Sequence, residues 1–462
     1  MKNRYNGLSI ASPHPDGVDL VQKLSLLLAG LGVLILLVAW GGLTFDHNTL
    51  FLSLSIGSII IGTTIFSIRY YLSRPAGIKN NQVMFLALTN RGMWGWITGI
   101  LLTGFYVLLY WFPQYIGLSA NGEGNTGLVA LFDPLSQFFK GKPGSQWFVY
   151  GTIYTVAILA LGVKFMLKYR HNRYQLWRTV AVVASQLFLA YLIPEILEGL
   201  NSDQAYFAKD LKFFWPLNYY FFEDWHLNNM TASGPMGMFY LVWSILGFVV
   251  LTPIITYFVG KRWYCSWICG CGGLAETAGD PFRHLSSKKL GSWQFERWLI
   301  HGVLVAITLV TAVVLYGYFA GVDDFMGLSI YKYFRQPYGF LVGAIFSGVI
   351  GVGFYPLLGN RVWCRFGCPM AAYIGLFQRF KSRFRITTNG SQCISCGNCS
   401  TYCEQGIDVR WYAQRGENIV RSSCVGCGIC SAVCPRGVLK LENGPEEGRF
   451  NNGPIVLTPD NE

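Results

Sequence analysis

The chain has 462 residues, of which 52% are hydrophobic and only 13% are charged, and its formal net charge is +12. A soluble globular protein carries about a quarter charged residues, so this composition excludes an ordinary soluble domain, and its apolar content excludes a disordered chain. A basic soluble protein would suggest nucleic acid as a partner, but membrane loops are rich in Lys and Arg for another reason. The composition therefore indicates a protein that sits in membrane lipid and binds no nucleic acid.

Runs of about 20 apolar residues, the length that crosses a bilayer, predict about eight transmembrane helices. Five are expected in a membrane region at residues 24–234 and three in a second membrane region at residues 235–385. The expected spans are 24–45, 49–68, 92–112, 147–167, 176–197, 235–259, 298–320 and 337–358. In the fifth span Gln186 and Glu195 are costly in lipid, and we expect them to face the bundle or a cavity.

The Lys and Arg residues between these spans predict the orientation. With the N-terminus inside, 24 of them fall in inner segments and 6 in outer loops, which is the bias of a multi-pass protein of the bacterial inner (cytoplasmic) membrane. Both termini are then cytoplasmic. Residues 1–23 form a cytoplasmic N-terminal segment, and the first span is not followed by the small-residue site of a cleaved signal peptide.

Eight cysteines near the C-terminus form two runs with the same spacing, at 393–403 and 424–434. This is the pattern of bacterial two-cluster ferredoxins, in which the first three cysteines of a run bind one [4Fe–4S] cluster and the fourth binds the other. The expected ligands are Cys393, Cys396, Cys399 and Cys434 for cluster 1, and Cys424, Cys427, Cys430 and Cys403 for cluster 2. Zinc is the alternative, but zinc sites usually pair two Cys-x2-Cys knuckles across a longer spacer.

These runs predict a cytoplasmic two-cluster ferredoxin domain at residues 386–441, followed by a disordered tail at 442–462. Glu404 stands where the first run usually has a proline. Because proline is not a ligand, we expect this departure to affect only the local geometry of the loop.

Four further cysteines lie in an internal repeat with an offset of 99 residues. Each copy follows the inner end of a span and contains a Cys-x3-Cys pair beside a basic residue, Arg262 in one copy and Arg361 in the other. The four cysteines are Cys265, Cys269, Cys364 and Cys368. Two such loops side by side would supply enough thiolates for one further iron–sulfur cluster at the membrane surface, whose negative charge the arginines would partly neutralise. The alternatives are two separate clusters or reduced structural thiols.

Cys271 is the thirteenth cysteine, and Met370 takes its place in the second copy. It is interpreted either as a free thiol or as an extra ligand to iron. The predicted topology places all the cysteines at the cytoplasmic side, where thiols stay reduced and disulfides are rare.

The combination of spans, two Cys-x3-Cys loops and a two-cluster ferredoxin resembles the membrane-bound polyferredoxins, which include NapH-like, NosR-like and CcoG-like proteins. The resemblance covers roughly residues 235–440. It implies electron transfer between a quinone pool or a cytoplasmic donor and a respiratory or assembly partner in the membrane. The family usually has Cys-x3-Cys-Pro in both loops, whereas here only Cys368-Pro369 keeps the proline and the first copy reads Cys269-Gly270-Cys271. The first five spans have no counterpart in this pattern.

Three functional hypotheses follow. The first is an iron–sulfur electron-transfer protein, such as the electron-transfer subunit of a quinol dehydrogenase, with quinone as a candidate partner. The second is a redox assembly or maturation factor for a metal-containing oxidase or reductase. The third is a transporter or redox sensor with regulatory clusters.

Overall fold

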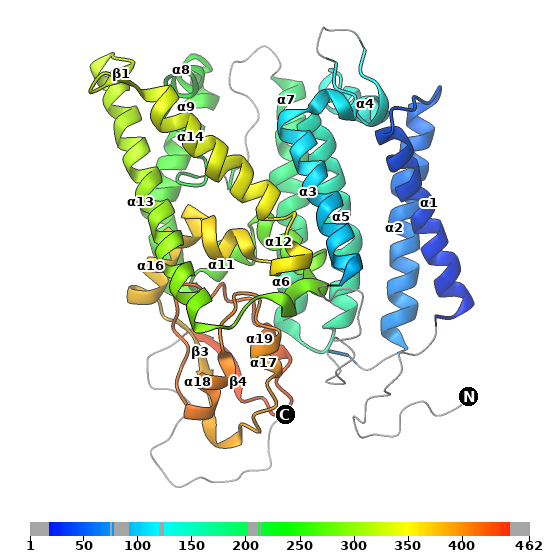
Figure 1. Ribbon diagram of the computed structural model, residues 1–462, viewed down its shortest axis with the longest axis vertical. Coiled ribbons are helices and arrows are strands. Elements are labelled where there is room, and N and C mark those ends of the chain that lie inside the picture. Colours follow the sequence, from blue (N-terminus) through cyan, green and yellow to red (C-terminus); the bar gives the residue numbers. More distant parts are fainter. Residues whose placement is uncertain are drawn as a thin grey trace.

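The computed structural model describes residues 18–73, 76–77, 92–119, 124–201, 211–212 and 214–443. Residues 1–17 of the expected N-terminal segment and 444–462 of the expected tail lie outside the described residues. Long helices form the larger part of the molecule, and a small domain that contains β3 and β4 lies at the end of this helical part where α1 begins (Figure 1).

Seven helices of the described chain are long and apolar enough to cross a membrane. Two of them, Arg173–Leu200 and Gly234–Val259, contain a π-helical stretch between two α-helical parts. The seven are α1 (Leu20–Trp40), α2 (Asn48–Leu72), α3 (Met93–Trp111), α5 (Gln146–Lys168), α6–η3–α7 (Arg173–Ala184, Ser185–Leu192, Ile193–Leu200), α9–η4–α10 (Gly234–Leu246, Gly247–Leu251, Thr252–Val259) and α13 (Leu290–Ala320). The expected multi-pass helical fold is confirmed.

The eighth expected span, 337–358, is not a single helix. Three segments, η6 (Tyr331–Arg335), α14 (Gln336–Tyr338) and η7 (Gly339–Ile350), form a helix that ends at Ile350, and after a turn the chain enters α15 (Tyr355–Leu358). The turn packs tightly against α3, because a Cβ on Gly353 in that turn would lie only 2.6 Å from the Thr103 Oγ1. The apolar stretch is thus divided between a helix and a separate short helix.

Short elements cover the end of the helical part opposite the small domain. They include η2 (Pro113–Ile116), α4 (Gly127–Lys140), α8 (Asp224–Ala232) and the hairpin of β1 (Asp324–Phe325) and β2 (Leu328–Ser329); α4, α8 and β1 are labelled there in Figure 1. The Nζ of Lys140 in α4 lies 2.8 Å from Glu195 Oε2 in α7. This ion pair gives Glu195 a charged partner at this end of the helical part.

The two Cys-x3-Cys loops repeat each other in structure as well as in sequence. The first contains α11 (Arg262–Cys265), α12 (Gly270–Thr277) and η5 (Asp280–Leu285), and the second contains η8 (Trp363–Gly367) and α16 (Pro369–Lys381). Both begin at a glycine in nearly the same backbone conformation, with φ 73° and ψ −174° at Gly260 and φ 100° and ψ 171° at Gly359. Because this region of φ is strained for any residue with a Cβ, the repeat requires glycine at both positions.

The small domain is built on one antiparallel strand pair. β3 (Phe384–Thr388) pairs with β4 (Leu439–Asn443), with Phe384 opposite Asn443 and Thr388 opposite Leu439. Between the strands lie η9 (Gly390–Gln392), α17 (Asn398–Thr401), α18 (Val409–Arg415) and α19 (Ile429–Ala432). α17 and α19 each start after a left-handed glycine, Gly397 and Gly428, and the same turn thus follows the second cysteine of each run.

Candidate iron–sulfur centres

The first cavity of the small domain is lined by three cysteines of one run and the last cysteine of the other. The four are Cys393, Cys396, Cys399 and Cys434. Four sulfurs around one apolar pocket are the donor set of a [4Fe–4S] cluster, so these residues fit the group. Burial raises the pKa of Cys399 to about 12, so the neutral thiol is favoured there. A thiolate at this position needs a positive charge beside it, and iron would supply that charge.

The second cavity has the complementary set of cysteines. It is lined by Cys403, Cys424, Cys427 and Cys430. Burial likewise raises the pKa of Cys424 to about 11. In the described part of the chain, no group of three or more side chains of the types His, Cys, Asp and Glu is arranged to hold a single metal ion. The eight cysteine sulfurs of the small domain are arranged around two pockets instead. The structure thus brings together the two sets of four expected from the spacing, and their assignment to particular clusters stays a prediction.

The four cysteines of the membrane loops also come together. Cys265 ends α11, Cys269 precedes α12, Cys364 lies in η8 and Cys368 precedes α16, and all four are buried in one apolar cluster. Burial raises the pKa of Cys368, and the other three thiols lie close enough to raise it further. A donor set of four thiols shared between two loops fits a further cluster, with two ligands from each loop.

Only one of the two expected arginines reaches a sulfur of these loops. The Nη1 of Arg361 lies 3.7 Å from the Cys364 Sγ, to which it donates a hydrogen bond. Arg262 instead lies over aromatic rings, 4.8 Å from the Phe384 ring centre and 5.3 Å from that of Trp267. Arg361 is therefore the arginine that can compensate the negative charge of thiolates at this site.

Cys271 lies beside the same group of thiols. It hydrogen-bonds to Cys269, and this bond lowers the pKa of Cys269 to about 6. It also packs against the apolar cluster that holds the four loop cysteines. Its role as an extra ligand stays a prediction.

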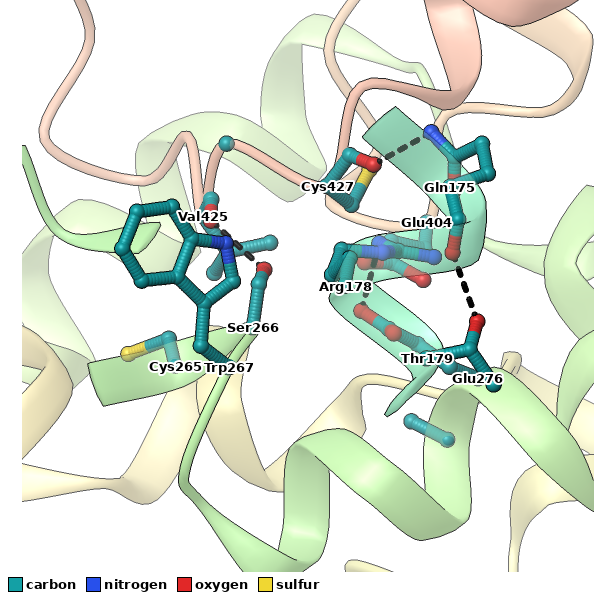
Figure 2. Close-up of polar contacts among 12 residues, drawn as sticks. Gln175, Arg178, Thr179, Cys265, Ser266, Trp267, Glu276, Glu404, Val425 and Cys427 are labelled. Carbon is teal, nitrogen blue, oxygen red and sulfur yellow. Dashed lines mark hydrogen bonds and ion pairs between the residues drawn. The ribbon is translucent and has the colours of Figure 1, made fainter. Parts of the chain in front are cut away.

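The three cysteine groups are contiguous. Cys399 of the first cavity lies within electrostatic range of Cys430 of the second. The Oγ of Ser266, next to Cys265, donates to the carbonyl oxygen of Val425 at 2.8 Å, as Figure 2 shows. This bond joins the first membrane loop to the segment between Cys424 and Cys427. These contacts link the first cavity to the second, and the second cavity to the first membrane loop, so the three cysteine groups form one series.

The fifth span, which sequence analysis left without a role, holds both the ferredoxin domain and the first membrane loop. The Nε2 of Gln175 in α6 donates to the carbonyl oxygen of Cys427 at 2.9 Å (Figure 2). Further along the same span, in η3, the Nε2 of Gln186 donates to the carbonyl oxygen of Ile268 at 2.6 Å. This hydrogen bond offsets the cost of Gln186 in lipid. The helix α6–η3–α7 therefore positions the ferredoxin loop around Cys427 and the first membrane loop relative to each other.

Glu404 does more than shape its loop, contrary to expectation. Its side chain is fully buried, with Oε2 2.5 Å from Arg283 Nη1 and Oε1 3.0 Å from Arg361 Nη2. Burial alone would raise the pKa of Glu404, but these guanidinium groups outweigh it and hold the pKa at about 2. A glutamate directly after a cluster cysteine, where a proline is usual, was the signal in the sequence that could have identified this site.

Glu404 belongs to a buried ionic network that sequence analysis missed. Glu276 in α12 bridges Arg178 of α6 and Arg361, each at 2.7 Å. Burial raises the pKa of Glu276 to about 7 against the effect of both arginines. Arg178 had been expected only as an inner-side charge that sets the topology, and Arg361 only as a charge beside the membrane-loop cluster. The network connects the fifth span, both membrane loops and the ferredoxin domain.

Comparison with protein families covers the part of the chain that holds these cysteines. Residues 241–291 and 339–387 match the family described as a 4Fe-4S binding domain. Residues 385–435 match the family described as a 4Fe-4S dicluster domain. The first match contains the two membrane loops and the second contains both ferredoxin runs, so the chain has iron–sulfur binding domains in both parts.

Relatives with curated names match the same kind of segment. The chain is 27% identical over 178 residues to YccM of Escherichia coli (strain K12), a protein named for electron transport, and the match covers 36% of the chain and 46% of YccM. It is 26% identical over 171 residues to the methylamine utilization ferredoxin-type protein MauN of Paracoccus denitrificans (strain Pd 1222), covering 34% of the chain and 53% of MauN. The regulatory protein NosR of Stutzerimonas stutzeri is 26% identical over 161 residues, 33% of the chain and 20% of NosR.

The chain thus spans about half the length of YccM and MauN, and no solved structure matches it. The shared part is the one that carries the cysteines, while the N-terminal spans lie outside the family matches. The expected resemblance is confirmed for the part of the chain that carries the cysteines, which is similar to ferredoxin-type electron transport proteins.

Proposed function

We propose that the chain is a relay that passes electrons through three iron–sulfur clusters, two in the ferredoxin domain and one shared by the two membrane loops. When bound, the clusters supply one-electron redox chemistry. The protein supplies the thiols, the buried charges around them and the fixed spacing between them. At the other end of the relay we propose a membrane quinone or a respiratory protein as the redox partner.

The contact between the ferredoxin domain and the membrane loops is the observation that carries this proposal. The chain places hydrogen-bond donors from three membrane elements on one ferredoxin loop: Ser266 on Val425, Gln175 on Cys427, and Gln378 of α16 on the carbonyl oxygen of Cys424 at 2.7 Å. A regulatory or storage site needs no such anchoring. A relay does, because electron transfer between clusters depends on a fixed short separation.

The 24-to-6 distribution of Lys and Arg supports a cytoplasmic position for the ferredoxin domain and both termini, in a bacterial inner membrane. A soluble cytoplasmic donor or acceptor could then reach cluster 1, which lies furthest along the series from the membrane loops. The exposed Cys396 and the half-exposed Cys393 and Cys434 make that cluster the accessible one.

Anaerobic purification followed by iron and sulfide analysis tests the cofactor content. Three clusters predict about twelve irons per chain, whereas about eight would remove the membrane-loop cluster from the relay. Addition of menaquinol to the oxidised protein tests the partner: we expect the visible absorbance of the clusters to bleach. No bleaching with menaquinol, in protein that dithionite does bleach, would exclude the quinone partner.

A further inference from the structure

A cavity between the N-terminal spans points to the place where a quinone binds. It has a volume of about 480 Å³ and is walled by α1, α2, α3 and α5, the helices that the family matches leave unexplained. α12, which belongs to the first cysteine loop, and α15, which precedes the second, close its inner side. Figure 1 shows α1 and α2 at the edge of the molecule, beside α5. The cavity therefore extends from the edge of the bundle to the cysteine loops.

The lining residues are apolar apart from the tyrosines and Trp40. Tyr106 and Tyr150 satisfy each other, with their hydroxyl oxygens 3.1 Å apart. Tyr154 of α5 and Tyr355 of α15 also line the cavity, and among the described residues the structure gives neither hydroxyl a hydrogen-bond partner. Tyr355 is 5% exposed. An unused donor and acceptor at the wall of a cavity can bind a polar group, so these two phenols favour an occupant with a polar group at this end.

Each of these phenols adjoins one cysteine loop. A Cβ on Gly270, the residue between Cys269 and Cys271, would lie 2.5 Å from the Tyr154 hydroxyl oxygen. Tyr355 belongs to the short helix that leads directly into the second loop. Cys271 lies within electrostatic range of both hydroxyls. The polar end of the cavity is thus its end nearest the membrane-loop cysteines.

We propose that this cavity binds an isoprenoid quinone or quinol, with its ring oxygens hydrogen-bonded to Tyr154 and Tyr355 and its tail between α1, α2 and α3. A phospholipid acyl chain would fill the apolar part but offers no hydrogen-bonding group to the phenols. The inference rests on the proposed function. Oxidation of one quinol there releases two electrons, which two clusters take up one each, and two protons, which pass to water.

Binding of a fluorescent hydroxyquinoline N-oxide, a quinol analogue, to the purified full chain tests the proposal without requiring turnover. We expect saturable binding, weakened about tenfold by Tyr154→Phe and by Tyr355→Phe, since each removes one hydrogen bond. Ala157→Phe, which places a ring in the cavity, should abolish it. The matched control is Tyr338→Phe, because the Tyr338 hydroxyl has no hydrogen-bond partner either but lies outside this cavity.

The two proposals fail in different ways. If the analogue binds the wild type and all four variants equally, or if menaquinol bleaches the clusters of Ala157→Phe as it does those of the wild type, the quinone site lies elsewhere and the quinone-linked relay stands. If the analogue does not bind the wild type while menaquinol still bleaches its clusters, the cavity assignment is again overturned. If menaquinol bleaches no clusters in the wild type, the quinone partner itself is excluded.

Discussion

Replacing Glu404 with alanine tests whether the buried ionic network holds the ferredoxin domain on the membrane part. The substitution removes the carboxylate that lies between Arg283 and Arg361, whose side chains are fully buried. Removal of one partner from a buried ion pair typically costs about 3–5 kcal/mol because the other charge stays buried. Here Arg361 keeps Glu276 and Arg283 keeps Asp280 at 3.2 Å, so we expect the lower end, about 3 kcal/mol.

For a folding unit of about 150–250 residues, that loss lowers the thermal midpoint by roughly 6–12 °C. The assay is the loss of cluster absorbance on heating the anaerobic, detergent-solubilised protein. Glu417→Ala is the matched control, since Glu417 lies in the same domain with an exposed side chain, and it should shift the midpoint by no more than about 2 °C. Equal midpoints for the two variants would refute the structural role of the network.

Three further substitutions test the cysteine groups. Arg361→Gln should lower the reduction potential of the membrane-loop cluster by about 60 mV, the equivalent of a tenfold change for one electron, because it removes the positive charge beside the Cys364 sulfur. In the same redox titration, Arg262→Gln should leave that potential unchanged. Cys403→Ser should abolish the signal of the cluster held by the second run and spare that of the first, and loss of the first signal instead would show that the crossed assignment is incorrect. Cys271→Ser should leave the iron content at the wild-type value, and a loss of about four irons would make Cys271 a ligand.

The cysteine groups could be predicted from the sequence because their chemistry depends on local spacing. Two-residue gaps at 393–399 and 424–430 place three thiols on one loop whatever the rest of the fold does. Cys364 and Cys368 repeat the spacing of Cys265 and Cys269. These two pairs could be predicted for the same reason, since each pair lies in a loop that directly follows a span.

The docking of the domains could not be predicted, because it depends on contacts between residues far apart in the chain. Nothing local to Gln175 or Gln186 indicates that their amides reach the carbonyl groups of Cys427 and Ile268. Composition also misleads at Arg178, which has the sequence signature of an ordinary inner-side charge but is buried in an ion pair with Glu276. The eighth expected span shows the same limit, since its apolar residues continue past the turn at Gly353, which packs against Thr103 of α3.

The most direct measurement of the relay is an anaerobic redox titration followed by electron paramagnetic resonance. Three contiguous clusters predict that the fully reduced protein shows about three unpaired spins per chain, with signals broadened by magnetic interaction between neighbouring clusters. Fewer than two spins per chain, or sharp signals that show no interaction at full reduction, would contradict a relay of three clusters in contact.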